Sequence, residues 1–133
     1  MARPSKENHI LFLLTVGLLA WMVPGGGHFL LKEKERAIII FTTIVLTFCV
    51  GLYVGSIGVI DPVKTWWWYL AQILNSPIVA VLGRMNAQGQ FPVYGRACDI
   101  GQIYTSIAGL LNLLCIVNAV YLAYLRGTKT AGD

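Results

Sequence analysis

The stretch Trp21–Arg36, WMVPGGGHFLLKEKER, separates two apolar segments and decides how the chain is expected to fold. Proline ends or kinks a helix, and glycine lets the backbone adopt the conformations of a tight turn. The alternating charges of KEKER are typical of a solvated turn at a water boundary. The predicted hairpin turn consists of Pro24, Gly25, Gly26, Gly27 and His28.

Charged residues are scarce on both sides of this turn. They make up 12% of the 133 residues, whereas soluble domains carry about 25%. Residues 37–60 and 100–125 contain no Asp, Glu, Lys or Arg. Each of these segments is longer than the ~20 apolar residues needed to cross a hydrocarbon core. The sequence therefore predicts an integral membrane protein.

The predicted fold is all-α, with three to four membrane-embedded helical segments in one domain of residues 1–133. The first two segments, about 10–31 and 37–60, form a helical hairpin, and the last covers about 100–125. Segment 62–84 is either interfacial or re-entrant, or a broken, kinked span, because a cluster of aromatic residues precedes a break at NSP. Aromatic and basic residues gather at membrane interfaces. The expected anchors are Trp21, Trp66, Trp67, Trp68, Tyr69, Lys32, Lys34 and Arg36.

The basic residues leave the orientation open if four segments cross the membrane. The ten Lys and Arg residues then divide equally between the two sides. A re-entrant first segment changes the division to seven and three, with the N-terminus inside. The apolar stretch after Arg3 and Lys6 lacks a cleavage site and is interpreted as an uncleaved signal anchor.

The last predicted helix carries a stripe of small and polar residues. Members recur in steps of four and three, and the second segment adds a GxxxG pair. In lipid, small residues let helix backbones approach closely, and Asn forms hydrogen bonds across the contact. This surface therefore packs the two helices together or docks onto another membrane subunit. It comprises Gly51, Gly55, Gly101, Thr105, Ala108, Asn112, Cys115 and Ala119.

Residues suited to catalysis or ion coupling are few. The apolar segments contain no carboxylate of the kind that transporters generally use, and the glycines lack Walker spacing. The three cysteines form no metal-binding pattern, and no basic cluster with interleaved aromatics favours nucleic acid. We expect neither enzyme activity nor a metal site. His28 has the chemistry to ligate haem or a chlorophyll-type pigment, or to contact a lipid headgroup. The alternative is that it forms a hydrogen bond with a backbone carbonyl in the turn.

Two stretches resemble known families. VPGGGHFLLKEKERAIIIF resembles the hairpin of small bacterial membrane proteins of the transmembrane-two-domain type, with its P-G-x-G-H-F pattern. DIGQIYTSIAGLLNLLCIVNAVYLA is similar to the C-terminal helix of a related bacterial membrane family of unknown function. The resemblance implies a helical hairpin and a bacterial origin, and therefore the cytoplasmic membrane, but no established activity.

The leading prediction is a small non-enzymatic accessory or assembly subunit of a larger bacterial membrane complex, with an energy-transducing complex as one candidate. The bilayer and other membrane subunits are the expected partners. The alternative is a cofactor- or lipid-binding membrane module centred on His28 and the basic turn. A small oligomeric transporter or channel is disfavoured because the apolar segments lack charge.

Overall fold

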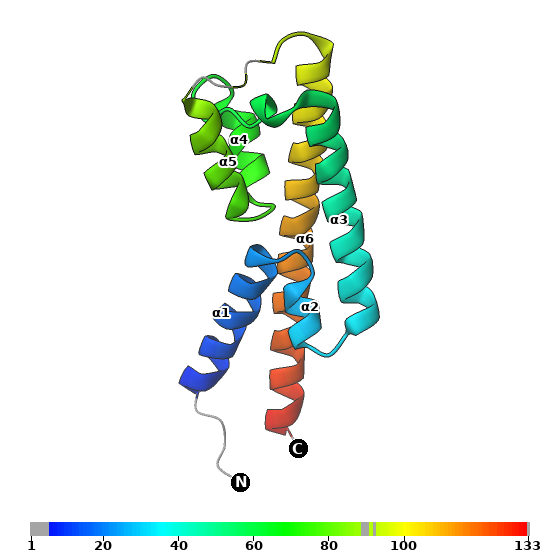
Figure 1. Ribbon diagram of the computed structural model, residues 1–133. Coiled ribbons are helices and arrows are strands. Elements are labelled where there is room, and N and C mark those ends of the chain that lie inside the picture. The colour runs from blue at the N-terminus through cyan, green and yellow to red at the C-terminus, as the bar shows by residue number, and fades with distance from the viewer. Residues whose placement is uncertain (1–5, 89–90, 92, 133) are drawn as a thin grey trace.

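The computed structural model describes residues 6–88, 91 and 93–132, and its regular elements are all helical (Figure 1). This confirms the predicted all-helical chain for the described residues. The elements are α1 (Lys6–Met22), α2 (Gly26–Leu30), α3 (Lys34–Gly55), the 3-10 helix η1 (Ile57–Val59), α4 (Trp66–Ile73), α5 (Ile78–Ala87) and α6 (Arg96–Gly132).

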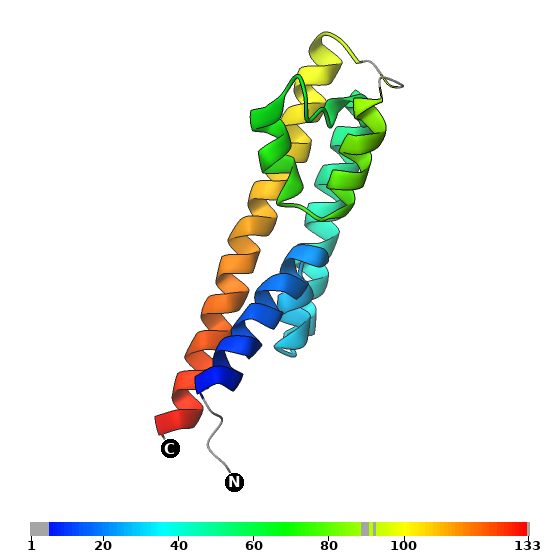
Figure 2. The same ribbon diagram turned by 90° about the vertical axis from the view of Figure 1, so that its left-hand side faces the viewer.

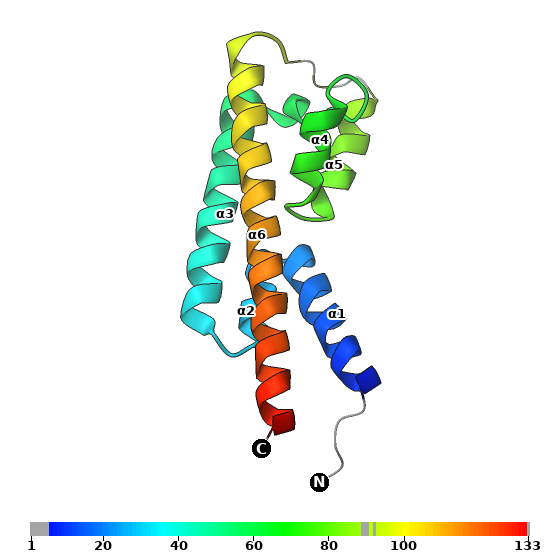
Figure 3. The same cartoon turned by 180° about the vertical axis from the view of Figure 1, so that it is seen from behind.

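The two long helices, α3 and α6, pack side by side and form the frame of the molecule (Figure 3). Within the described residues, these are the two helices long and apolar enough to cross a membrane. The 37 residues of α6 make it about 55 Å long, so it would extend beyond a ~30 Å hydrocarbon core. It begins four residues before the predicted segment and ends seven residues after it.

The GxxxG pair brings α3 and α6 together. A Cβ atom on Gly51 would lie 2.7 Å from the methyl group of Thr105, and one on Gly55 would lie 3.0 Å from the Cα of Gly101. These glycines therefore permit backbone contact between the two helices. The structure uses the GxxxG pair for helix packing inside the chain, which is the first of the two predicted alternatives.

The predicted segment 10–31 is two helices rather than one. α1 runs from the end of the molecule that also holds the last turn of α6 to about the middle of α6, and α2 returns toward that end (Figure 1). The turn between them uses Gly25, which has a φ of 82°. Gly26 and Gly27 lie inside α2, not in the turn. A Cβ on Gly27 would lie 2.9 Å from the Cβ atoms of both Ala20 and Ala119, so glycine is required there for packing.

α4 and α5 form a second half-length hairpin, which enters from the opposite end of the molecule (Figure 2). α4 packs against the N-terminal half of α6, whereas α5 packs against α4 and η1, and the turn between α4 and α5 lies at the NSP break. Segment 62–84 is thus divided into two short helices that reverse direction at the break. α4 starts only at Trp66, because Asp61 accepts hydrogen bonds from the backbone N–H groups of Val63 (2.8 Å) and Lys64 (3.0 Å) in a preceding turn.

The expected interfacial anchors divide into two groups. Trp66 is 51% exposed and Trp67 is 81% exposed at the start of α4, close to one end of the molecule. Trp68 is also exposed and Tyr69 is half-buried, whereas Lys32, Lys34 and Arg36 are exposed at the other end. Trp21 does not fit the prediction, because its indole N–H donates to the carbonyl of Ile73 (3.1 Å) where the two hairpins meet.

Candidate functional site

The tips of the two half-length hairpins meet beside Asn112, near the middle of α6. The Asn112 Nδ2 group donates to the carbonyls of Asn75 (2.9 Å) and Leu74 (3.0 Å), at the tip of the α4–α5 hairpin. It also lies 3.4 Å from the carbonyl of Ala20, in the last turn of α1. A single fully buried amide therefore binds the ends of both hairpins.

Two further side chains complete this junction. The Trp21 indole donates to Ile73, and the Ser76 hydroxyl donates to the carbonyl of Met22 (3.3 Å). The last carbonyls of a helix have no partner within that helix. The junction supplies donors to several of these carbonyls at the ends of α1 and α4. The Oδ1 atoms of Asn75 and Asn112 remain buried without a protein partner.

Amide and hydroxyl side chains also hold the α4–α5 hairpin against its neighbours. The Gln72 Nε2 group donates to the carbonyl of Val59 (3.1 Å) and to the Oγ1 of Thr105 (2.8 Å). Asn86 Nδ2 donates to the carbonyls of Gly58 (3.2 Å) and Ile60 (3.1 Å). These bonds connect α4, α5, η1 and α6. Their donors are neutral, so they fix geometry without supplying an acid or a base.

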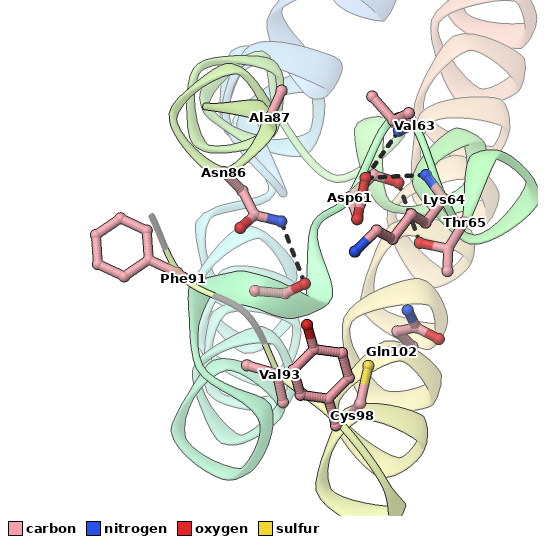
Figure 4. A pocket seen from close by; sticks show the side chains of 12 residues that line it. Asp61, Val63, Lys64, Thr65, Asn86, Ala87, Phe91, Val93, Cys98 and Gln102 are labelled. Carbon is pink, nitrogen blue, oxygen red and sulfur yellow. Dashed lines mark hydrogen bonds between the residues drawn. The ribbon is translucent and has the colours of Figure 1, made fainter. Parts of the chain in front are cut away.

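A cavity of about 510 Å³ opens at the end of the molecule away from the last turn of α6 (Figure 4). Its walls come from η1, the turn before α4, the end of α5, the segment before α6 and the first turns of α6. Figure 4 shows Asp61 and Lys64 on one wall, Cys98 and Gln102 on α6, and Asn86 on α5. Charged side chains and amide side chains thus line one shared space.

No group of three or more His, Cys, Asp or Glu side chains that could hold a metal ion occurs in the part of the chain that the structure describes. Cys49, Cys98 and Cys115 are free thiols that lie on different parts of the frame. The polar cavity therefore presents charge and hydrogen-bonding groups rather than a ligand set for a transition metal.

The stripe on α6 is directed into the protein. Its members are buried, except for the half-buried Cys115, and α6 packs against α1, α3 and α4 along it. Asn112 was predicted to be a contact across helices, and it bonds both hairpins. Asn118 points elsewhere, as its six-residue separation from Asn112 requires. The stripe residues thus pack the helices of this chain and are not available to another subunit.

His28 lies between α2 and α6. The imidazole is fully buried, and its Nε2 atom is 3.3 Å from the Nδ2 atom of Asn118. Its Nδ1 atom has no partner. A haem or pigment would reach this ring only if α2 and α6 separated. Lys32, Lys34 and Arg36 are exposed at the nearby end, but their side chains do not form a shared site with the ring.

Sequence reasoning missed the amides of the α4–α5 hairpin. Gln72 follows the aromatic cluster, Asn75 belongs to the NSP break, and Asn86 lies near the end of the second short apolar stretch. The available signal was an amide side chain within or beside a short apolar segment, because such a group needs a partner when it is buried.

The comparisons with known proteins give one result. A family model described as a family of unknown function, DUF6677, matches residues 15–129. No curated protein and no solved structure matches the chain. The matched range includes the second half of α1, all of α2, α3, α4 and α5, and α6 as far as Lys129. It also includes all the residues that line the polar cavity.

Proposed function

The chain belongs to the DUF6677 family, and from that premise we propose that it is a multi-pass protein of the bacterial cytoplasmic membrane and a non-enzymatic accessory or assembly subunit of a larger complex. In this proposal α3 and α6 cross the bilayer. The α1–α2 hairpin enters from one side and the α4–α5 hairpin from the other, and both turn back near the middle.

The hydrogen bonds at the hairpin tips support the membrane location. Backbone groups inside a bilayer need protein partners because the hydrocarbon core supplies none. A helix that ends at mid-depth leaves carbonyls unpaired, and Asn112, Trp21 and Ser76 donate to such carbonyls here. Outside the junction, the faces of α3 and α6 away from the hairpins expose large apolar side chains, including Ile39 (65%) and Leu114 (66%).

The positions of the basic residues support one orientation. The end that holds the start of α1, the α2–α3 turn and the end of α6 has seven of the ten Lys and Arg residues when those at the chain ends are counted by sequence position. They are Arg3, Lys6, Lys32, Lys34, Arg36, Arg126 and Lys129. The other three are Lys64, Arg84 and Arg96. By the positive-inside rule, the first end faces the cytoplasm.

One observation carries the non-enzymatic role. The buried polar side chains of the junction and the α4–α5 hairpin donate mainly to backbone carbonyls of this chain. They are occupied in holding two short hairpins in place, and they include no acid–base pair. Because these polar groups bond within the chain, the surface left for a partner is mainly apolar. Such a surface suits an accessory subunit.

Cysteine labelling of intact cells tests the arrangement. In a variant without Cys49, Cys98 and Cys115, the Lys64→Cys substitution should react with a membrane-impermeant maleimide from outside. Lys34→Cys, at a position that is also exposed, should react only after the cells are opened. Labelling of both residues from the same side would contradict the opposed hairpins and the two crossings.

Extraction from native membranes tests the accessory role. After mild detergent treatment, native mass measurement of the tagged full-length chain should find it bound to other membrane subunits in fixed ratio. A chain that emerges only as a monomer, or only with copies of itself, would overturn this role and leave the topology unaffected.

A further inference from the structure

The polar cavity carries features of a binding site. Its volume of about 510 Å³ falls within the ~300–1,000 Å³ of small-molecule sites. Five separate parts of the chain contribute its walls, and Asn86 fixes two of them through its bonds to the carbonyls beside η1. The shape of the cavity is therefore set by hydrogen bonds that a ligand does not need to break.

One carboxylate and one ammonium group face this space. The Oδ1 of Asp61 accepts two backbone N–H groups, which orients the carboxylate. The Lys64 side chain extends into the space enclosed by the lining residues (Figure 4). Neither group belongs to a salt bridge within the described part of the chain, where the ion pairs join Glu33 to Arg36 and to Arg126. Both charges are therefore available to a ligand.

Gln102 gives an independent indication of a ligand. Its side chain lines the cavity and the residue is only 5% exposed. The amide has no hydrogen-bond partner among the described residues, since the only bond recorded for Gln102 outside the helix ladder is accepted by its backbone carbonyl. Among the described residues, the fully buried side-chain atoms without a partner belong to His28, Gln72, Asn75 and Asn112, so the Gln102 amide keeps access to the open space of the cavity. A ligand with polar groups in that space can form a hydrogen bond with it.

The charge pair defines the chemistry of that ligand. A simple cation would be repelled by Lys64 and a simple anion by Asp61, whereas a compact zwitterion pairs with both groups. The exposed Trp66 and Trp67 lie close to this end of the molecule, and such side chains occupy the headgroup level of a bilayer. An ammonium and a phosphate a few bonds apart occur together in abundant headgroups at that level.

We propose that this cavity binds a zwitterion of the phosphoethanolamine type, with its ammonium at Asp61, its phosphate at Lys64 and a hydrogen bond to Gln102. The source is either a lipid headgroup or the free compound. The lipid source rests on the proposed membrane location, whereas binding of the free compound does not.

Calorimetry on the purified full-length protein in a maltoside detergent measures binding of the free compound, with phosphoethanolamine as the probe. Native mass measurement from nanodiscs that contain phosphatidylethanolamine, compared with nanodiscs of phosphatidylglycerol alone, measures retention of the lipid. Binding in either arm supports the proposal and identifies the source. Absence of binding in both arms overturns it, as does inorganic phosphate binding as tightly as phosphoethanolamine, because Asp61 would then have no role.

Substitutions locate the site. Asp61→Asn keeps an acceptor for the two backbone N–H groups, so the turn is retained while the charge is lost. Asp61→Asn, Lys64→Gln and Gln102→Leu should each weaken binding about tenfold or more. Arg84→Gln removes an exposed charge at the same end that does not line the cavity, and it should leave binding unchanged. Equal losses in Arg84→Gln and Lys64→Gln would overturn the assignment. Normal maleimide labelling of Lys34 and Lys64 cysteine variants shows separately whether the proposed topology holds.

Discussion

The two half-length hairpins are alike in outline but are held on α6 by different means. Each enters from one end, turns near the middle and returns to the end from which it came (Figures 1 and 2). The α1–α2 hairpin relies on small residues and close backbone approach. The α4–α5 hairpin relies more on hydrogen bonds from amide and hydroxyl side chains.

Close packing dominates the α1–α2 hairpin. Gly27 lies against the methyl groups of Ala20 and Ala119, and Val16, Ala119 and Ala123 form a buried cluster with Leu31. Dispersion contacts accumulate when atoms fill space in this way. Close contacts between small side chains and backbone therefore hold the α1–α2 hairpin against α6.

Side-chain hydrogen bonds are more numerous around the α4–α5 hairpin, which also packs on a buried apolar cluster of Val59, Ile60 and Val79. Gln72 and Asn86 each donate to a backbone carbonyl of a neighbouring element. Hydrogen bonds fix a helix at a few positions and do not require the space between those positions to be filled. The polar cavity lies beside this hairpin. The polar cavity therefore lies at one end of this small protein, and the closely packed α1–α2 hairpin lies at the other.

The largest expected effect concerns the one place where the α4–α5 hairpin does approach α6 closely. A Cβ atom on Gly109 would lie 1.9 Å from the carbonyl oxygen of Ala71. Gly109→Ala must therefore push α4 away from α6, and we expect a loss of about 3 kcal/mol in the free energy of unfolding. Thermal or denaturant unfolding in detergent measures it.

Gly17→Ala is the matched control in the other hairpin. The nearest atom to its new Cβ would be a methyl group of Val120 at 3.3 Å, which a small side-chain movement relieves. We expect the free energy of unfolding to change by less than about 1 kcal/mol, because the higher helix propensity of alanine partly offsets the cost of this contact. A larger loss in Gly17→Ala than in Gly109→Ala would reverse the predicted contrast.

The next effect tests whether the hairpins depend on one another. Asn112→Ala removes a donor from the tips of both hairpins at once, and we expect a loss of about 2 kcal/mol. Hydrogen exchange should become faster at residues 20–23 and at residues 73–76 together. Faster exchange at only one tip would show that Asn112 holds that hairpin alone.

Asn118→Ala is the control on the same helix. Asn118 is exposed and its recorded side-chain contact is with His28. Hydrogen bonds between membrane helices average about 0.6 kcal/mol, so this substitution should cost less than Asn112→Ala. It should leave hydrogen exchange at the α4–α5 tip unchanged.

The sequence predicts the frame of this fold better than its hairpins. The long uncharged segments and the GxxxG pair predicted α3, α6 and the small-residue face between them, because length and periodicity are local properties of the chain. The break at NSP also predicted the division of segment 62–84. The sequence placed Trp21 at an interface, whereas it bonds Ile73 at the hairpin junction. That contact joins residues 52 positions apart, and no local pattern encodes it.

The glycines after Pro24 are a second case in which the local sequence does not predict a tertiary contact. A proline and three glycines predict a turn, and Gly25 does make the turn with its positive φ. Gly26 and Gly27 instead begin a short helix. A Cβ on Gly26 would lie 2.7 Å from the carbonyl oxygen of Leu19. Glycine is needed there for a tertiary contact, and sequence alone does not distinguish that need from a need for turn flexibility.

The smallest expected effect isolates one hydrogen bond of the α4–α5 hairpin. Gln72 Nε2 donates to Thr105 Oγ1, and that hydroxyl donates in turn to the carbonyl of Gly101 (2.8 Å). Gln72→Leu and Thr105→Val remove the two partners, and a double-mutant cycle separates their coupling from the other bonds each makes. We expect a coupling of about 1 kcal/mol, within the range measured for membrane helices.

The double-mutant cycle tests the difference between the two hairpins, because it measures how much a single hydrogen bond contributes to the free energy of unfolding. Ser106→Ala serves as the control, since its hydroxyl lies 3.4 Å from the Trp68 carbonyl, beyond the usual hydrogen-bond distance, and should couple weakly with Gln72→Leu. Coupling near 1 kcal/mol for Thr105 and near zero for Ser106 would mean that a few short bonds position α4. Equal coupling at both positions would mean that packing positions it, as in the α1–α2 hairpin.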